Sequence, residues 1–299
     1  MLNRRHIRTI VVQTIYSNYI ELIDKKNYSK IVKENAIISL ELFLNVIDYL
    51  KEIHLYFNNL ESQKFSCPFI SNNPYFFFFS KINTEKIKRN NRINWDLHHN
   101  YIIEIQNQIF ELNKEYIERK EKADKLYLEF FIETYSDIVV TSEILHDFLE
   151  EQNINWVNDF PYVNSFLIKE INSIDIQSPS SFNLPTPSVF EEEIRFGQLL
   201  LNSVLDNYTE LLSNLDGRTP NWDSDRIALI DKLIMVIAIA ELIYFPLIPT
   251  KVTINEYIEI AKEFSTPSSG KFVNGILDNI VKDLTKSGLI VKKGRGLIT

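Results

Sequence analysis

The apolar positions in the last quarter of the chain predict a buried helix. Between residues 225 and 244 they cover nearly the whole helical circumference, a pattern typical of a core helix rather than of a surface helix. Pro246 and Pro249 should end it, because proline lacks an amide proton and disfavours helix at the preceding residue. The pattern therefore predicts a fully buried helix that stops shortly after Tyr244.

Two further helices follow. Thr253 and Glu256 have the spacing of a capping box, with Val252 and Tyr257 at the positions of a hydrophobic staple. A third helix should start near residues 266–267, with proline at its first position, and Gly288 is a plausible terminator.

The first residues predict an amphipathic helix over 4–22 with Asn3 as its N-cap. Its inward stripe, spaced at three and four residues, is Ile7, Ile10, Val11, Thr14 and Ile15. Four-residue steps place Arg4, Arg8, Val12 and Tyr16 along one outward edge. Cations in the first turn oppose the helix dipole. One interpretation is that an anionic partner neutralises the positive charges of Arg4, Arg5 and Arg8. The alternative is that these flexible side chains are simply solvated at a fraying helix end.

The middle of the chain predicts long amphipathic helices near 29–60, 99–133 and 134–151, and another over 190–215. Residues 174–189 are rich in Ser and Pro and predict a linker.

The aromatic run 75–79 favours burial over base stacking, because exposed phenylalanines promote aggregation. An Asn-Trp pair recurs at 94–95, 155–156 and 221–222, which indicates either duplicated helical units or chance in an Asn-rich chain.

Composition excludes several classes of protein. Seven glycines in 299 residues argue against a nucleotide-binding α/β fold, which needs glycine in its phosphate loops. Cys67 is the single cysteine, so an intrachain disulfide is excluded and a cytoplasmic setting is expected. Neither a membrane-spanning run nor a signal-peptide cleavage site is found. The net charge of −8 argues against nucleic-acid binding, but both chain ends are locally basic.

The sequence offers no catalytic constellation. It contains no HExxH, GxGxxG or Walker motif, and its five histidines have no metal-ligand spacing with cysteine. His98 and His99 beside Asp96 fit a metal site less well than a solvated helix start. We therefore expect no enzyme activity, cofactor, metal or small-molecule substrate.

Two strings carry a family resemblance. Residues 251–256, KVTINE, and 271–275, KFVNG, resemble the C-terminal subdomain of the NusB transcription antitermination factors. Near the N-terminus, Arg4-Arg5-His6-Ile7-Arg8 followed by residues 12–16, VQTIY, resembles the arginine-rich motif and "VQALY"-like segment of that family. The chain is similar to the long form of the Bacteroidetes lineage, with a large insertion between the two matching parts.

The resemblance implies an all-α NusB-like helical bundle of two subdomains, split by a helical insertion. It implies a basic helix at 1–27, an insertion at 28–173, the linker at 174–189, a C-terminal helical domain at 190–288 and a basic tail at 289–299. It also implies cytoplasmic function in regulating transcription termination. The expected partners are boxA-type RNA, the small-subunit ribosomal protein NusE and the RNA polymerase antitermination complex.

The resemblance assigns site residues by position. The expected RNA-binding residues are Arg4, Arg5, His6, Arg8, Lys271, Phe272 and Ser268. Ser268 stands where the family has an acidic residue involved in RNA binding, so a hydroxyl there should repel phosphate less. Tyr16 and Asp231 are expected at the NusE interface. The alternative is a non-catalytic helical interaction scaffold that has lost RNA specificity.

Overall fold

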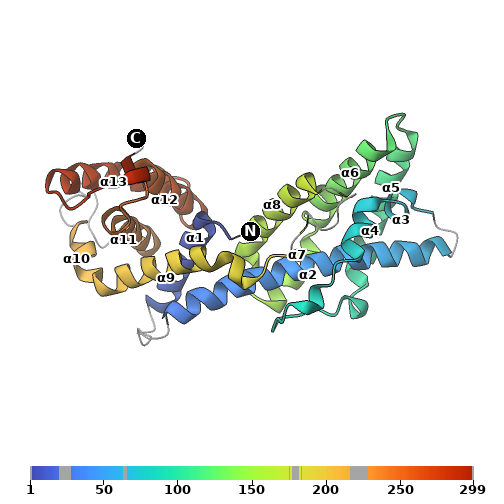
Figure 1. The fold of residues 1–299 in the computed structure, drawn as a ribbon, viewed down its shortest axis with the longest axis horizontal. Helices are drawn as coiled ribbons and strands as arrows, with labels where there is room; N and C mark the ends of the chain where they lie inside the picture. The colour runs from blue at the N-terminus through green and yellow to red at the C-terminus, as the bar shows by residue number, and fades with distance from the viewer. Residues whose placement is uncertain are drawn as a thin grey trace. The chain divides into compact units, whose positions relative to one another are not determined.

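The computed structural model describes residues 2–19, 28–62, 66–174, 176, 182, 184–215 and 228–297, and every regular element among them is helical (Figure 1). The predicted all-α fold is confirmed. Contacts within the chain define two compact units. We call Leu2 with residues 37–190 the insertion unit. Residues 3–36 and 191–299, which come from both ends of the chain, form the terminal unit.

The terminal unit is built around α11 (Leu229–Tyr244), whose side chains from 233 to 242 are all fully buried. This helix contacts α1 (Arg4–Tyr19), α9 (Glu191–Asp206), α10 (Tyr208–Ser213), α12 (Thr250–Phe264) and α13 (Ser269–Lys286) (Figure 1). The prediction of a buried core helix ending before Pro246 is confirmed for the part from residue 228 onward. Residues 216–227, where we placed its first turn and the third Asn-Trp pair, lie outside the described residues.

Helix α1 follows its sequence pattern on the inward side. All five residues of the predicted stripe are buried, and Asn3 caps the helix by accepting a hydrogen bond from the His6 amide at 2.9 Å. The helix packs closely on α9 at Gly197, where a Cβ would lie 2.5 Å from the side chain of Ile7. A larger residue at this glycine would therefore push α1 and α9 apart.

The capping box and the hydrophobic staple predicted for the second helix are wrong. Helix α12 begins at Thr250, directly after Pro249, so all four residues lie inside its first two turns. Tyr257 is buried, whereas Val252 is 43 % exposed, and these two side chains do not form a staple. Thr253 and Glu256 instead bind side chains of other helices, as described below.

Two other boundaries differ from the prediction. Helix α13 begins at Ser269, with Ser268 as N-cap, so Pro267 lies before the helix and not at its first position. Gly288 has a φ of +75° just after α13, as expected of a helix terminator. The helix predicted over 190–215 breaks at Asn207 between α9 and α10.

The insertion unit contains most of α2 (Tyr28–Ser62), which confirms the long helix predicted there. The predicted helix over 99–133 is instead two helices separated at residues 119–122, and that over 134–151 is a π-helical turn followed by a separate α-helix. The elements after α2 are α3 (Pro68–Ser71), α4 (Pro74–Ser80), η2 (Thr84–Lys86), η3 (Trp95–Leu97), α5 (Asn100–Glu118), α6 (Ala123–Glu133), η4 (Thr134–Val139), α7 (Glu143–Gln152), α8 (Trp156–Ser173) and η6 (Pro187–Phe190).

A polar stripe along α2 holds the irregular segment 84–99. Its four residues, at i, i+4, i+7 and i+11, are Glu41, Asn45, Asp48 and Glu52. The carboxylate of Glu41 accepts hydrogen bonds from the Asn90 amide and the Asn91 side chain, both at 2.6 Å. Asp48 pairs with the buried Arg89. The stripe therefore substitutes for regular secondary structure in fixing this segment.

Both described Asn-Trp pairs use tryptophan in the same way. The indole of Trp95 donates to the Asn45 carbonyl at 2.9 Å, and that of Trp156 donates to the Ile38 carbonyl at 3.1 Å. Each indole thereby anchors a later segment to the backbone of α2. The aromatic run is mostly buried, as predicted: only Phe77, at 53 %, is exposed among its five rings.

Candidate nucleic-acid interface

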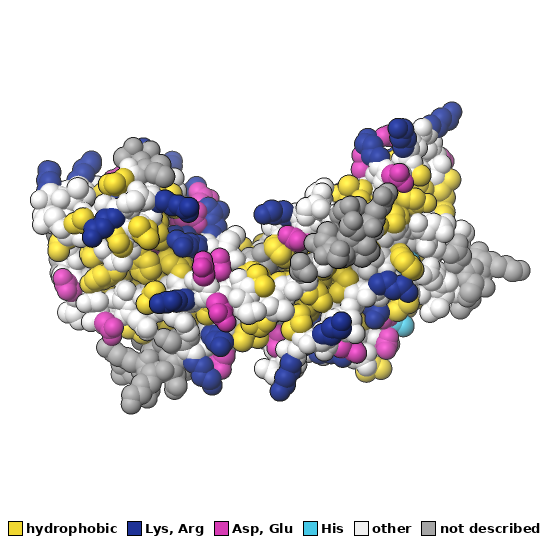
Figure 2. Space-filling view, viewed as in Figure 1, with side chains coloured by type: hydrophobic (Ala, Val, Ile, Leu, Met, Phe, Trp, Pro, Cys, Tyr) yellow, Lys and Arg dark blue, Asp and Glu magenta, His cyan; other side chains and the backbone are white. Residues whose placement is uncertain are grey.

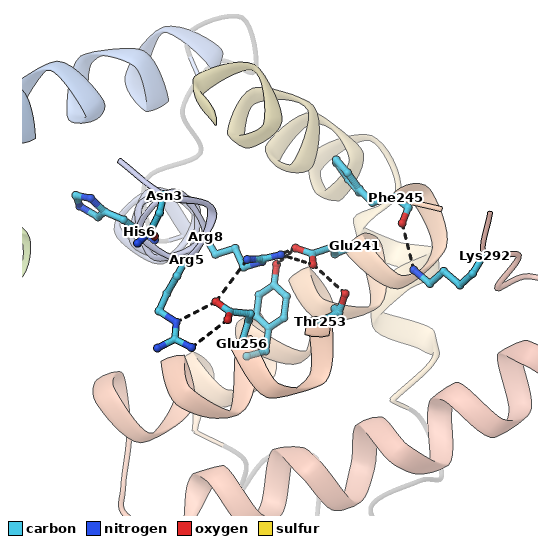
Figure 3. A network of polar contacts seen from close by, with 10 residues as sticks. Asn3, Arg5, His6, Arg8, Glu241, Phe245, Thr253, Glu256 and Lys292 are labelled. Atoms are coloured by element: carbon cyan, nitrogen blue, oxygen red, sulfur yellow. Dashed lines mark hydrogen bonds and ion pairs between the residues drawn. The ribbon is translucent and has the colours of Figure 1, made fainter. Parts of the chain in front are cut away.

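The basic residues at the start of α1 have four different environments. Arg4 and Arg5 are exposed, while His6 and Arg8 are 0 % and 2 % exposed. Figure 3 shows His6 pointing to the side of α1 opposite Arg8, which points toward α11 and α12. The motif is therefore not one uniform basic surface, and its members must be considered one at a time.

Arg8 and Glu241 form a buried bidentate pair. Nε and Nη2 of Arg8 donate to the two carboxylate oxygens of Glu241, each at 2.7 Å, and the two side chains are 3 % and 0 % exposed (Figure 3). Parallel hydrogen bonds of this kind are shorter and stronger than neutral ones. They join the first helix of the chain to the core helix of the terminal unit.

Two more donors complete the environment of Glu241. The Thr253 hydroxyl donates to one carboxylate oxygen at 2.9 Å and the Tyr257 hydroxyl donates to the other at 3.1 Å. Burial by itself would lower the pKa of Arg8, but the hydrogen bonds and negative charge of Glu241 outweigh it and raise that pKa. Burial, together with the charge of Glu241, raises the pKa of Tyr257. Arg8 therefore keeps its charge despite its burial, and each carboxylate oxygen of Glu241 accepts two hydrogen bonds.

Arg5 is bound by a second carboxylate at the surface. Its Nε and Nη2 donate to Glu256 at 2.9 and 3.0 Å, and Nη1 of Arg8 lies 3.5 Å from the same carboxylate. The side chain of Arg5 is 44 % exposed and that of Glu256 is 19 % exposed. A phosphate could therefore reach Arg5, but it would compete with Glu256.

Arg4 differs from both neighbours. Its guanidinium lies 5.1 Å from the centre of the Phe196 ring, a cation–π contact that leaves the charge uncompensated. Among the residues that the structure describes, no carboxylate forms an ion pair with Arg4. Arg4 is thus the cation of the motif that is both exposed and available to a phosphate.

The outward edge predicted from four-residue spacing is wrong for two of its four members. Arg8 and Val12 are buried, because α1 is covered by α9 on one side and by α11 on another. Arg4 and Tyr16 are exposed as predicted, Tyr16 at 46 %. The buried positions of Arg8 and His6 correct the expectation that they face RNA in this conformation.

The start of α13 holds the other expected RNA-binding residues. Lys271 and Ser268 are exposed and Phe272 is half-buried. Gly270 packs against Lys262 of α12, and a Cβ there would lie 2.9 Å from the lysine chain. Helix α12, which carries Glu256 and Lys262, therefore connects the position of Arg5 with that of Lys271.

Asp231 is largely buried at the start of α11. It is 6 % exposed, and one carboxylate oxygen accepts a hydrogen bond from the Ser269 hydroxyl at 2.9 Å. This bond ties the first turn of α11 to the first turn of α13. The expected contact of Asp231 with a partner protein stays a prediction, and within the terminal unit its side chain joins two helices.

Charge is mixed over the visible surface. On the face drawn in Figure 2, Lys and Arg side chains alternate with Asp and Glu and form no continuous basic area.

In the described part of the chain, one group of metal-ligand side chains occurs, in the insertion unit: Glu52, Asp96 and His99 have ligand atoms within 4.8 Å of one another. His99 hydrogen-bonds Glu52, the last member of the polar stripe of α2, at 3.4 Å.

The Arg8–Glu241 pair was missed by sequence reasoning, although a signal was present. Glu241 interrupts a helix that is otherwise apolar from residue 233 to 243. A buried carboxylate needs a cation or several donors, so its position predicts a buried basic partner. The sequence did not indicate which of the thirty-two Lys and Arg residues supplies it.

The sequence of the C-terminal part of the chain matches one group of known proteins. The family model described as the NusB family matches residues 167–282, from within α8 to within α13. Transcription antitermination protein NusB from Geobacter sp. is 36 % identical over 127 residues, which cover 42 % of this chain and 88 % of that protein. The chain belongs to the NusB family.

Two other relatives match over shorter parts of their length. The NusB protein of Chloroherpeton thalassium is 46 % identical over 99 residues, 33 % of this chain and 47 % of the relative. That of Salinibacter ruber is 43 % identical over 103 residues, 34 % of this chain and 64 % of the relative. The chain thus spans about half to two thirds of these two proteins. No solved structure matches, and no helix in the described residues is long and apolar enough to cross a membrane.

Proposed function

We propose that this protein is a non-catalytic transcription antitermination factor that binds boxA-type RNA together with NusE. Family membership supports the antitermination role, since the relatives bear that name. The observation that carries the RNA proposal is the exposed guanidinium of Arg4, which no described carboxylate neutralises. Such a cation is free to contact a phosphate without first breaking an internal ion pair.

The proposal gives different roles to the three arginines. Arg4 contacts phosphate directly, together with Lys271 at the start of α13. Arg5 contacts phosphate only when Glu256 releases it. Arg8 has no direct contact and instead positions α1 by binding Glu241. These three roles differ from a model in which every basic residue of the motif contacts RNA.

The NusE interface is proposed at the exposed Tyr16, two turns along α1 from the buried Arg8. Tyrosine supplies a large amphipathic surface and is enriched at protein interfaces. Asp231 supports this face indirectly through Ser269. The RNA polymerase antitermination complex is the larger assembly in which the protein would act.

Fluorescence anisotropy with a labelled boxA-type RNA, with and without NusE, tests the proposal. Arg4→Glu should abolish measurable binding or weaken it at least tenfold. Lys120→Glu, at an exposed position of the insertion unit, makes the same change in net charge and should have little effect. Tyr16→Ala should lower NusE affinity and leave the binding of RNA alone unchanged. Equal losses with Arg4→Glu and Lys120→Glu would contradict a specific phosphate contact.

A second candidate is an interaction scaffold that docks NusE without reading RNA. It is favoured by the net charge of −8 and by the internal pairing of Arg5 and Arg8. Salt separates the two functions, because RNA affinity falls steeply as counterions compete for phosphates. NusE binding without RNA affinity at any salt concentration would support the scaffold.

A further inference from the structure

The insertion unit contains a cavity that the proposed antitermination function does not use. Its volume is about 460 Å³, within the range of small-molecule sites. One side is a face of α4 and the turn after it, with Pro74, Phe77 and Phe78 at helical spacing. Ile82 and three residues that follow α8 complete the apolar lining: Ile176, Phe182 and Leu184.

The aromatic rings give the cavity a defined shape. Phe182 meets Phe78 edge-to-face, with ring centres 5.8 Å apart and planes at 86°. It also meets Phe79 at 5.8 Å and 68°. These contacts bring residues about 100 positions apart in the sequence together around one space. Phe77, the exposed ring of the aromatic run, lies at the same cavity.

The polar part of the lining consists of hydrogen-bond donors. Lys81 and Lys86 are exposed, and the Lys81 ammonium lies 4.8 Å from the centre of the Phe77 ring. The remaining polar residue is Asn83, whose Oδ1 already accepts the Glu85 amide at 3.1 Å. Its Nδ2 is able to donate a hydrogen bond to a ligand. Among the residues that the structure describes, no carboxylate lines the cavity, and the neighbouring Glu85 pairs with Arg92.

We propose that this cavity binds a small free carboxylate with an apolar body. The apolar lining removes the body from water, at roughly 25 cal/mol per Å² of buried surface. Two ammonium groups and one amide N–H₂ then face the head group, which must supply acceptors and negative charge. All three polar groups donate. A carboxylate therefore offers them both acceptors and opposite charge, a hydroxyl offers acceptors without charge, and an ammonium head would face like charges. The proposal is independent of the RNA and NusE sites, which lie in the terminal unit.

Isothermal titration calorimetry with three ligands of one chain length tests the head group. Decanoate should bind, whereas 1-decanol should bind at least tenfold more weakly and decylammonium should not bind. This order follows because the carboxylate combines acceptors with a charge opposite to that of both lysines, whereas the ammonium head would face like charges. Equal affinity for decanoate and 1-decanol would overturn the proposal, and so would the absence of decanoate binding.

Two variants test the residues without disturbing the fold. Asn83→Asp keeps an oxygen that can accept the Glu85 amide, but it replaces the donor with a negative charge. It should abolish decanoate binding and leave 1-decanol binding within about twofold. Lys81→Gln/Lys86→Gln should weaken decanoate at least tenfold, while Lys120→Gln/Lys122→Gln, at exposed positions outside the cavity, should have no effect.

Unchanged decanoate affinity in both Asn83→Asp and Lys81→Gln/Lys86→Gln would overturn the assignment. Anionic vesicles provide the last comparison, since the same donors could meet a lipid head group. We expect no binding to vesicles of phosphatidylglycerol. If the parent chain bound these vesicles and Asn83→Asp did not, the ligand would be a membrane surface rather than a free carboxylate. That result would contradict the proposal.

Discussion

Arg8 and Glu241 bind each other through two hydrogen bonds of 2.7 Å, although 233 residues separate them in the sequence. Both are buried, and Glu241 receives further hydrogen bonds from Thr253 and Tyr257. A cation that belongs to a basic motif therefore functions inside the protein. Its removal should affect the folded state before it affects any ligand.

Arg8→Met should destabilise the protein by about 3–5 kcal/mol, because the change leaves the carboxylate of Glu241 buried without its cation. Urea unfolding of the whole chain, followed by circular dichroism, measures the change. The control is Arg92→Met, which breaks an exposed ion pair with Glu85 and should leave stability nearly unchanged. A stable Arg8→Met variant would show that the pair is not needed to dock α1.

Glu256→Gln should strengthen RNA binding, because it releases Arg5 from its internal carboxylate. One additional phosphate contact should steepen the slope of log K against log salt by about 0.7 for a single strand. Anisotropy titrations at several salt concentrations give this slope. Asp278→Asn, at an exposed position of α13, removes the same charge and should change the slope little. Similar slopes in both variants would mean that Arg5 does not exchange partners.

Ser268→Asp should weaken RNA binding about fivefold while preserving the fold. Ser268 occupies the N-cap position of α13 without a side-chain cap hydrogen bond, and aspartate is a favourable residue at such a position. A like charge about 4 Å from a phosphate costs roughly 1 kcal/mol in water. RNA affinity is measured beside thermal unfolding, with Ser268→Ala as the uncharged control. Unchanged or tighter binding of Ser268→Asp would place the RNA away from this turn.

His54 should make the stability of the insertion unit depend on pH. Burial, followed by the charge of Lys81, lowers the pKa of His54 below its ordinary value of 6.5. The unfolded chain then binds more protons than the folded chain just below pH 6.5, so stability rises with pH through that window and levels off above it. Its ring stacks on Phe76, and Nε2 lies 3.0 Å from the Asn58 amide nitrogen.

Unfolding free energies measured between pH 5 and 7.5 test this dependence. The slope below pH 6.5 should be smaller in His54→Gln than in the parent chain, because the variant lacks the titrating ring. His146→Gln is the control, since that ring is exposed and hydrogen-bonds the Val140 carbonyl. Identical slopes in the parent chain and His54→Gln would contradict the inferred neutral ring.

Periodicity predicted those elements whose position depends mainly on burial. The buried circumference of α11, the inward stripe of α1 and the length of α2 follow directly from apolar spacing. Helix starts were less predictable. Thr253 and Glu256 have capping-box spacing, but Glu241 and the arginines of α1 compete for both side chains. Tertiary hydrogen bonds thus overrode a local pattern.

The candidate interface was predictable only in part. Four-residue spacing placed Arg4 and Tyr16 correctly at the surface, but it could not show that α9 and α11 cover α1 at Arg8 and Val12. Local sequence does not state how much of a helix its neighbours cover. The conformation of segment 84–99 could not be predicted from its own sequence either. The side chains that fix it, among them Glu41 and Asp48, lie on another helix.

The distance in sequence between Arg8 and Glu241 also has a consequence for synthesis on the ribosome. Helix α1 emerges before its carboxylate partner, which is translated 233 residues later. At about 5–20 residues per second, the nascent arginine waits roughly 10–50 s for that partner. The insertion unit is complete in the meantime. The core of the terminal unit can therefore close only after residue 241 has been translated, and a chain that stops before residue 241 lacks the buried partner of Arg8.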